Sequence, residues 1–139
     1  MAYELINQSE VQVGYVYSTV KGETRKEQAQ VLNAINSTQC VSLQEQLGKT
    51  IMVKNVVCHG VEMTNEKTGE IAPAWRVILI ADDGTQYACV SKGVVGSLNK
   101  IFGVFGTPET WSEPLPLIAR KVQAKRGKSL ILEVDETAL

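Results

Sequence analysis

The sequence predicts a mainly β fold with some α-helix: an OB-like five-stranded barrel with one helix between its third and fourth strands, preceded by a short helical extension. Three observations predict it. From Lys49 onward apolar residues recur at every second position, an Asp-Asp-Gly triplet separates two apolar runs, and one helical apolar stripe interrupts the strands. The resulting order, three strands, a helix and two strands, is that of an OB-fold barrel. An open sheet with one covering helix is the alternative.

The length of 139 residues suits one domain with an appendage. We expect an N-terminal extension over residues 1–48, the barrel over 49–135 and a short tail over 136–139. Residues 1–22 alternate loosely and form either an extra strand or an arm. Thr24 with Glu27 makes a capping box and predicts a helix over about 25–36.

A second capping box, Ser42 with Glu45, predicts a helix of barely two turns that stops at Gly48. Two such short helices are unstable alone. We therefore expect the extension to dock on the barrel or on another subunit, with self-association favoured.

The first barrel strand begins near Lys49. Even spacing places Ile51, Val53 and Val57 on one face, with Lys54 and Cys58 opposite. A polar loop over residues 65–70 follows.

The run over residues 74–81 is nearly continuous in its apolar character and predicts a central, buried strand. Asp82-Asp83-Gly84 is a hairpin signal, and residues 85–91 form the return strand. Pairing across this turn would place Tyr87 opposite Leu79.

The segment that follows has the apolar stripe of a packed helix, which Gly103 and Gly106 are expected to end. Its apolar positions are Val94, Val95, Leu98, Ile101 and Phe102. After a proline-bounded linker, residues 115–124 and 129–136 read as two strands joined by Lys125-Arg126-Gly127-Lys128.

The composition excludes most enzyme and metal-site templates. Three widely spaced cysteines and one histidine, His59, predict a reduced chain without a disulfide framework, metal site or cofactor. Ser91 and Ser97 lack a nearby base, and the glycines match no phosphate-binding loop. We therefore expect that the protein is not an enzyme. The start of the chain lacks a signal-peptide pattern and no apolar run is long enough to span a membrane, so we expect a cytoplasmic protein.

Charge is segregated along the chain although the formal net charge is −1. Residues 115–128 carry five basic side chains and no acid, a plausible footprint for a polyanion. A solvated basic hairpin is the alternative. The candidate nucleic-acid-binding residues are Lys54, Trp75, Arg76, Tyr87, Lys92, Lys100, Trp111, Arg120, Lys121, Lys125, Arg126 and Lys128.

Aromatic residues on strands could supply the flat faces on which bases stack. For Trp75 and Tyr87 the alternative is core packing, and Trp75 leans toward the core because it alternates with Val77 and Leu79. Trp111 in the linker is either a stacking platform or an interface anchor.

Residues 42–134 resemble single-stranded DNA-binding proteins of bacteriophages and related mobile elements of Gram-positive bacteria. The matching pieces are SLQEQLGKTIMVKNVV, VEMTNEKTGEIAPAWRVILIADDG, YACVSKGVVGSLNKIFGVFG and PLPLIARKVQAKRGKSLILEV. The resemblance implies an OB-like fold, sequence-independent binding of single strands and a role in phage DNA replication or recombination.

We therefore expect a non-catalytic single-stranded DNA-binding protein, in the host cytoplasm if phage-encoded. Its expected partners are single-stranded DNA, further copies of itself as a homo-oligomer, and phage replication or recombination proteins. The alternative is a virion or assembly protein that uses the same surfaces for subunit contacts. Salt dependence separates the two, because binding by phosphate neutralisation weakens steeply with ionic strength.

Overall fold

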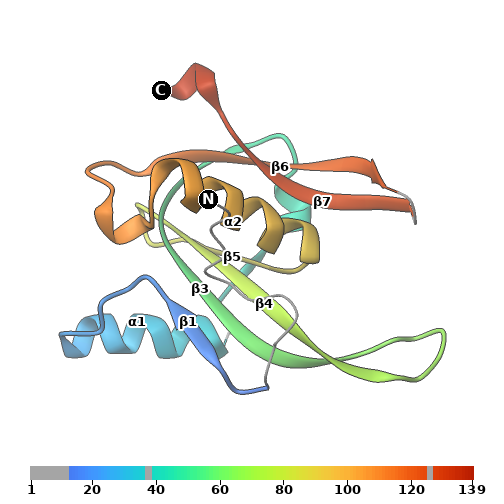
Figure 1. The fold of residues 1–139 in the computed structure, drawn as a ribbon. Coiled ribbons are helices and arrows are strands. Elements are labelled where there is room, and N and C mark those ends of the chain that lie inside the picture. The colour runs from blue at the N-terminus through green and yellow to red at the C-terminus, as the bar shows by residue number, and fades with distance from the viewer. Residues whose placement is uncertain (1–12, 37–38, 125–126) are drawn as a thin grey trace.

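The computed structural model describes residues 13–36, 39–124 and 127–139, and they form a mainly β molecule built on one curled, open sheet (Figure 1). Its elements in chain order are β1 (Val16–Ser18), α1 (Arg25–Asn36), β2 (Val41–Ser42), a 3₁₀ turn η1 (Leu43–Gln46), β3 (Thr50–Thr64), β4 (Ile71–Ala81), β5 (Gln86–Val90), α2 (Lys92–Phe105), η2 (Pro108–Thr110), β6 (Leu115–Ala124), β7 (Gly127–Val134) and η3 (Glu136–Ala138).

The five predicted barrel strands lie side by side in the order β5-β4-β3-β6-β7, flanked by β2 next to β5. β1 pairs with β3 beyond the short ladder that joins β3 to β6. This arrangement is consistent with an OB-like fold. Two expectations need correction: the described residues form seven strands rather than five, and within them no ladder pairs β5 with β7. The sheet is therefore a half-barrel, not a closed one.

The faces of β3 differ from the predicted pattern because the strand contains a bulge. The ladder to β4 shifts register between Val53 and Asn55, where Lys54 lies exposed. An extra residue at a bulge reverses the alternation beyond it. Val53 therefore shares the inner core with Val56 and Cys58. Val57, predicted on the face of Val53, belongs to the outer core instead.

Helix α2 fills the concave side of the sheet, and its apolar stripe forms the inner core with β3, β4, β6 and β7. Every residue of the predicted stripe is buried. Ser91 is the N-cap and accepts a hydrogen bond from the Val94 amide. The expectation that Gly103 ends the helix is wrong: the helix continues to Phe105 and is capped by Gly106, whose φ of 80° suits glycine.

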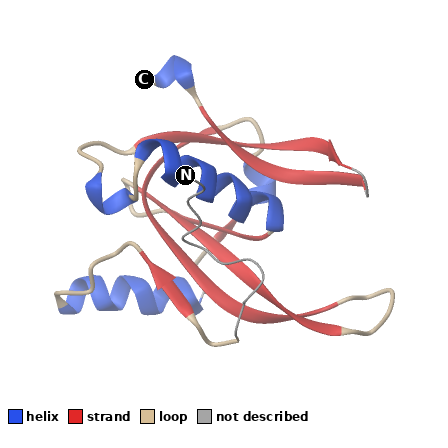
Figure 2. Cartoon of the chain, viewed as in Figure 1, coloured by secondary structure: helices blue, strands red, loops and turns tan. Residues whose placement is uncertain are grey.

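Helix α1 covers the opposite, outer face of the sheet, so that one helix packs on each face (Figure 2). It begins with a reciprocal capping box: the Glu27 amide donates to the Thr24 hydroxyl at 3.1 Å, and the Thr24 amide donates to the Glu27 carboxylate at 3.2 Å. Ala34 is fully buried and packs in the outer core with Ile78 and Ile80.

The predicted second helix does not form. Val41–Ser42 pairs in parallel with β5, and a single 3₁₀ turn follows. Ser42 is the N-cap of that turn but makes no capping hydrogen bond through its side chain. A fully buried Leu43 anchors the segment in the inner core instead.

Two hairpins, β3–β4 and β6–β7, project to the same side of the molecule with α2 between them (Figure 1). We call them the first arm and the second arm. They are hydrogen-bonded to each other at their base, where Thr50–Val53 pairs with Ile118–Leu115, and in the described residues the ladder ends there. Beyond this base the two arms pack on α2 rather than on each other.

Candidate nucleic-acid interface

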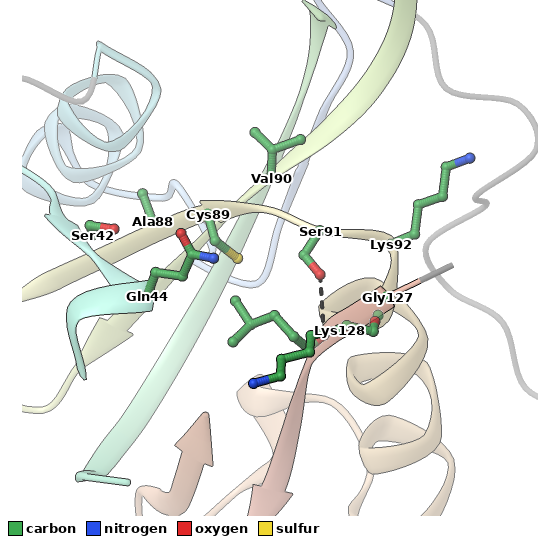
Figure 3. A pocket seen from close by; sticks show the side chains of 12 residues that line it. Ser42, Gln44, Ala88, Cys89, Val90, Ser91, Lys92, Gly127 and Lys128 are labelled. Carbon is green, nitrogen blue, oxygen red and sulfur yellow. Dashed lines mark hydrogen bonds between the residues drawn. The ribbon is translucent and has the colours of Figure 1, made fainter. Parts of the chain in front are cut away.

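Two hollows meet between the arms and form one groove. The larger, about 510 Å³, is the unclosed seam between β5 and β7 (Figure 3). The smaller, about 210 Å³, lies against the outer half of the first arm, near its tip, where Met63, Pro73 and Trp75 line it. Both are lined by Val90, Ser91 and Lys92, the residues that lead from β5 into α2. A single strand of nucleic acid that follows the groove would therefore pass over the start of α2.

Two serine side chains at α2 bind the backbone of β7 along the seam, an edge where no strand among the described residues pairs with it. Ser91 donates a hydrogen bond from its hydroxyl to the Leu130 carbonyl at 3.2 Å (Figure 3). Ser97 accepts one from the Leu132 amide at 3.0 Å. These bonds satisfy polar groups of the β7 backbone that a closed barrel would pair with another strand. The hydroxyls thereby hold the second arm against α2.

A glycine makes this close approach sterically acceptable. A Cβ at Gly93 would lie 2.2 Å from the Leu130 carbonyl oxygen and 2.5 Å from the Ser129 hydroxyl. Such distances are well inside van der Waals contact, so no larger residue fits without moving β7. The Ser-Lys-Gly sequence at the start of α2 therefore has a cap, a surface charge and a packing contact in consecutive positions.

Positive charge lies on both sides of the seam. Lys92 at the start of α2 and Lys128 on β7 are both exposed and line it, and their side chains extend in different directions (Figure 3). Arg120 on β6 forms an ion pair with Glu133 at 3.0 Å, with both side chains about half exposed. This ion pair reduces the charge that Arg120 offers to a phosphate.

The aromatic residue best placed to stack on a base is one that the sequence did not single out. The Tyr15 ring, 57% exposed, stands edge-on to Trp75 with centroids 5.7 Å apart. Gly60 lies between them on β3: its amide donates to the Tyr15 carbonyl, and its Cα is paired with Trp75.

Trp75 itself lies in the inner core with 7% of its surface exposed. Of its two predicted roles, base stacking and core packing, the structure therefore shows core packing. A buried indole has little face to offer a base, but Trp75 still lines the smaller hollow. Tyr87 is half-buried against the same core and is paired with Leu79, as the hairpin register predicted.

Two other candidates lie together but away from the groove. Lys54 and Trp111 line a separate hollow of about 410 Å³ beside β1 and the linker. Its lining includes four acidic residues, Glu27, Asp82, Glu109 and Glu113. The Trp111 indole donates hydrogen bonds to the Phe105 and Gly106 carbonyls and tilts against Phe102. Trp111 therefore anchors the linker to the end of α2.

The remaining candidates are dispersed. Arg76 is half-buried on β4, with its Cα paired with those of His59 and Val90. Lys100 is exposed on α2 and Lys121 on β6. Lys125 and Arg126 lie outside the described residues.

The tip of the first arm is unsuited to a polyanion. Glu62, Glu66 and Glu70 lie exposed there beside the single base Lys67. Like charges repel, so phosphates would avoid the tip. The electrostatics favour phosphates on the side of the groove away from that tip, over Lys92 and Lys128.

No helix among the described residues is long and apolar enough to cross a membrane. A model of the family described as phage single-stranded DNA-binding protein matches residues 10–134. No curated protein and no solved structure matches the chain. The family match covers both arms, α2 and most of the N-terminal extension.

Proposed function

The chain belongs to the phage single-stranded DNA-binding protein family, and from this premise we propose that it binds single strands without sequence preference, in the groove between its two arms. It protects or organises those strands during phage DNA replication or recombination. The family match favours this function over that of a virion or assembly protein, because it names the ligand.

The position of the groove supports the proposal. OB-folds bind oligonucleotides on the face of their second and third strands and with the loops that join strands one to two and four to five. In this chain the corresponding strands are β4 and β5, and the corresponding loops join β3 to β4 and β6 to β7. The β3–β4 loop carries the exposed acidic residues described above, so we expect the phosphates on the side of β5, α2 and β7. The two hollows at Val90–Lys92 lie beside these two strands, and the larger one has Lys92 on one side and Lys128 on the other.

The proposed mechanism is binding alone. Phosphates are neutralised by Lys92 and Lys128, whereas bases stack on the exposed Tyr15 ring, which accepts any base because every base has a π-face. We further propose that the protein acts in the host cytoplasm, that it self-associates, and that it works beside phage replication or recombination proteins.

A fluorescence titration tests the proposal. Oligo-dT added to the protein should change its tryptophan emission, because Trp75 lines the groove. Binding should weaken steeply when salt is raised from 50 to 200 mM. Unlabelled single strands of mixed sequence should compete well and duplex of equal length poorly. Equal competition by duplex, or affinity independent of salt, would contradict the proposed function.

A further inference from the structure

The smaller hollow has the character of an apolar pocket. Six of its eight lining residues are apolar, the other two being Ser91 and Lys92: Met63, Pro73, Ala74, Trp75, Val90, Ser91, Lys92 and Val95. Its volume of about 210 Å³ is below the range of roughly 300–1,000 Å³ that drug-sized ligands occupy. It therefore suits a group the size of one base.

The pocket has little capacity to hydrogen-bond such a group. The Ser91 hydroxyl already donates to the Leu130 carbonyl and accepts from the Val94 amide, each at 3.2 Å. Lys92 is exposed, so its charged end is free to follow the phosphates in solvent. A base in the pocket would be selected by apolar contact rather than by its Watson–Crick edge.

The pocket also lies where a bound strand would present a base. It shares Val90, Ser91 and Lys92 with the seam, so phosphates near Lys92 would run along its rim. Trp75, one of its walls, contacts the exposed Tyr15 ring on the other side. Met63 and Val90 are 43% and 40% exposed, so their apolar side chains are accessible to a base in the pocket.

We propose that this pocket receives one base of the bound strand and favours thymine. The proposal rests on the function proposed above and adds a modest base preference to it. Thymine differs from uracil by its C5-methyl group, and apolar protein surface contacts that methyl favourably. One buried methyl group corresponds to an affinity gain of about fourfold. Adenine, guanine and cytosine lack this apolar group.

The matched probes are oligo-dT and oligo-dU of the same length, both with deoxyribose, which differ by one methyl per base. The wild type should bind oligo-dT about fourfold more tightly than oligo-dU. Met63→Gln and Val90→Thr make the pocket polar at exposed positions. Both variants should bring the dT/dU ratio close to one, whatever change they cause in the affinity for the two oligomers together.

Val122→Thr is the control, because Val122 is an exposed strand valine, 37% accessible, that does not line the pocket. It should keep the wild-type ratio. Equal wild-type affinity for the two oligomers, or a ratio unchanged in both pocket variants, overturns the thymine pocket while leaving single-strand binding intact. Binding of neither oligomer by the wild type overturns the proposed function itself.

Discussion

Lys92 and Lys128 illustrate how position decides what a charge can do. The chain has fourteen basic residues, yet in the described residues these two exposed lysines stand on opposite sides of the seam. Lys54 is as exposed but lines a hollow with four acidic neighbours, whose field competes with its own. Exposure and charge are therefore insufficient to identify a phosphate ligand, and the neighbouring charges must be counted.

Replacing Lys92 and Lys128 by alanine should weaken single-strand binding several-fold for every sequence tested. The salt slope, measured by titrating oligo-dT at several ionic strengths, should fall by about 0.7 for each phosphate that is no longer neutralised. Lys54→Ala is the matched control and should leave the slope unchanged. The free energy of unfolding should change by less than about 0.5 kcal/mol per substitution in both the double variant and the control. An unchanged slope in the double variant would place the phosphates elsewhere.

Two cysteines should be chemically inert in the folded protein. Burial raises the pKa of the Cys89 thiol to about 12, although Arg76 opposes the rise. Burial, together with nearby Cys89, also raises the pKa of Cys58. Only a thiolate reacts quickly with disulfide reagents. At pH 8 such a reagent should therefore modify at most Cys40 in the native protein and all three thiols in denaturant; rapid reaction of more than one native thiol would contradict this.

At the scale of elements, the junction of β5, α2 and β7 depends on small residues. Gly93→Ala would push a methyl group into the β7 backbone at Leu130, and forced overpacking of this kind typically costs about 1–3 kcal/mol. Urea unfolding should show that loss. Gly103→Ala in the exposed part of α2 is the control and should gain up to about 1 kcal/mol from helix propensity. If the two substitutions changed the free energy of unfolding equally, β7 would be shifting away from residue 93 without cost, which would contradict the packing described here.

The elements also show what the sequence could and could not predict. β6 has the predicted bounds, residues 115–124, because a proline-bounded linker and a basic turn mark its ends. The faces of β3 were mistaken because a bulge leaves no mark in the hydrophobic pattern. The Ser42–Glu45 signature matched a capping box, but pairing with β5 and burial of Leu43 outweighed it.

The candidate site was predicted less completely, since it depends on contacts between distant segments. Lys92 and Lys128 could be proposed from charge, but that they share a seam follows from the position of β7 against α2. Tyr15 escaped notice because its contact with Trp75 exists through β1 pairing beside Gly60. The local alternation around residue 15 is too loose to reveal that pairing.

For the whole molecule, stability should decline in acid. Hydrogen bonds from the Thr85 amide and side chain hold the pKa of Asp83 below its ordinary value of 3.8, and those from the Thr137 and Thr50 side chains do the same for Asp135. A carboxylate with a lowered native pKa stabilises the fold fully above its unfolded pKa, and this contribution disappears as pH falls through the native pKa.

The urea midpoint should therefore be flat from pH 7 to about pH 5 and fall below about pH 4. Asp83→Asn retains an oxygen that can accept from Thr85 but does not titrate, so its midpoint should fall less between pH 5 and pH 3. A midpoint that is independent of pH down to 3, or equal acid loss in the variant, would contradict this account.

The short ladder at the base of the two arms has a topological consequence. A closed ring must be threaded from an end, whereas among the described residues the arms pair with each other only at Thr50–Val53 and no ladder joins β5 to β7, so the groove is open along its side. If a single strand binds in this groove, as proposed, we expect the protein to load onto the interior of a long strand without needing a terminus. Covalently closed circular single strands should compete for binding as well as linear ones of the same length and sequence, in a gel-shift assay. A marked advantage of the linear form would show that entry requires an end.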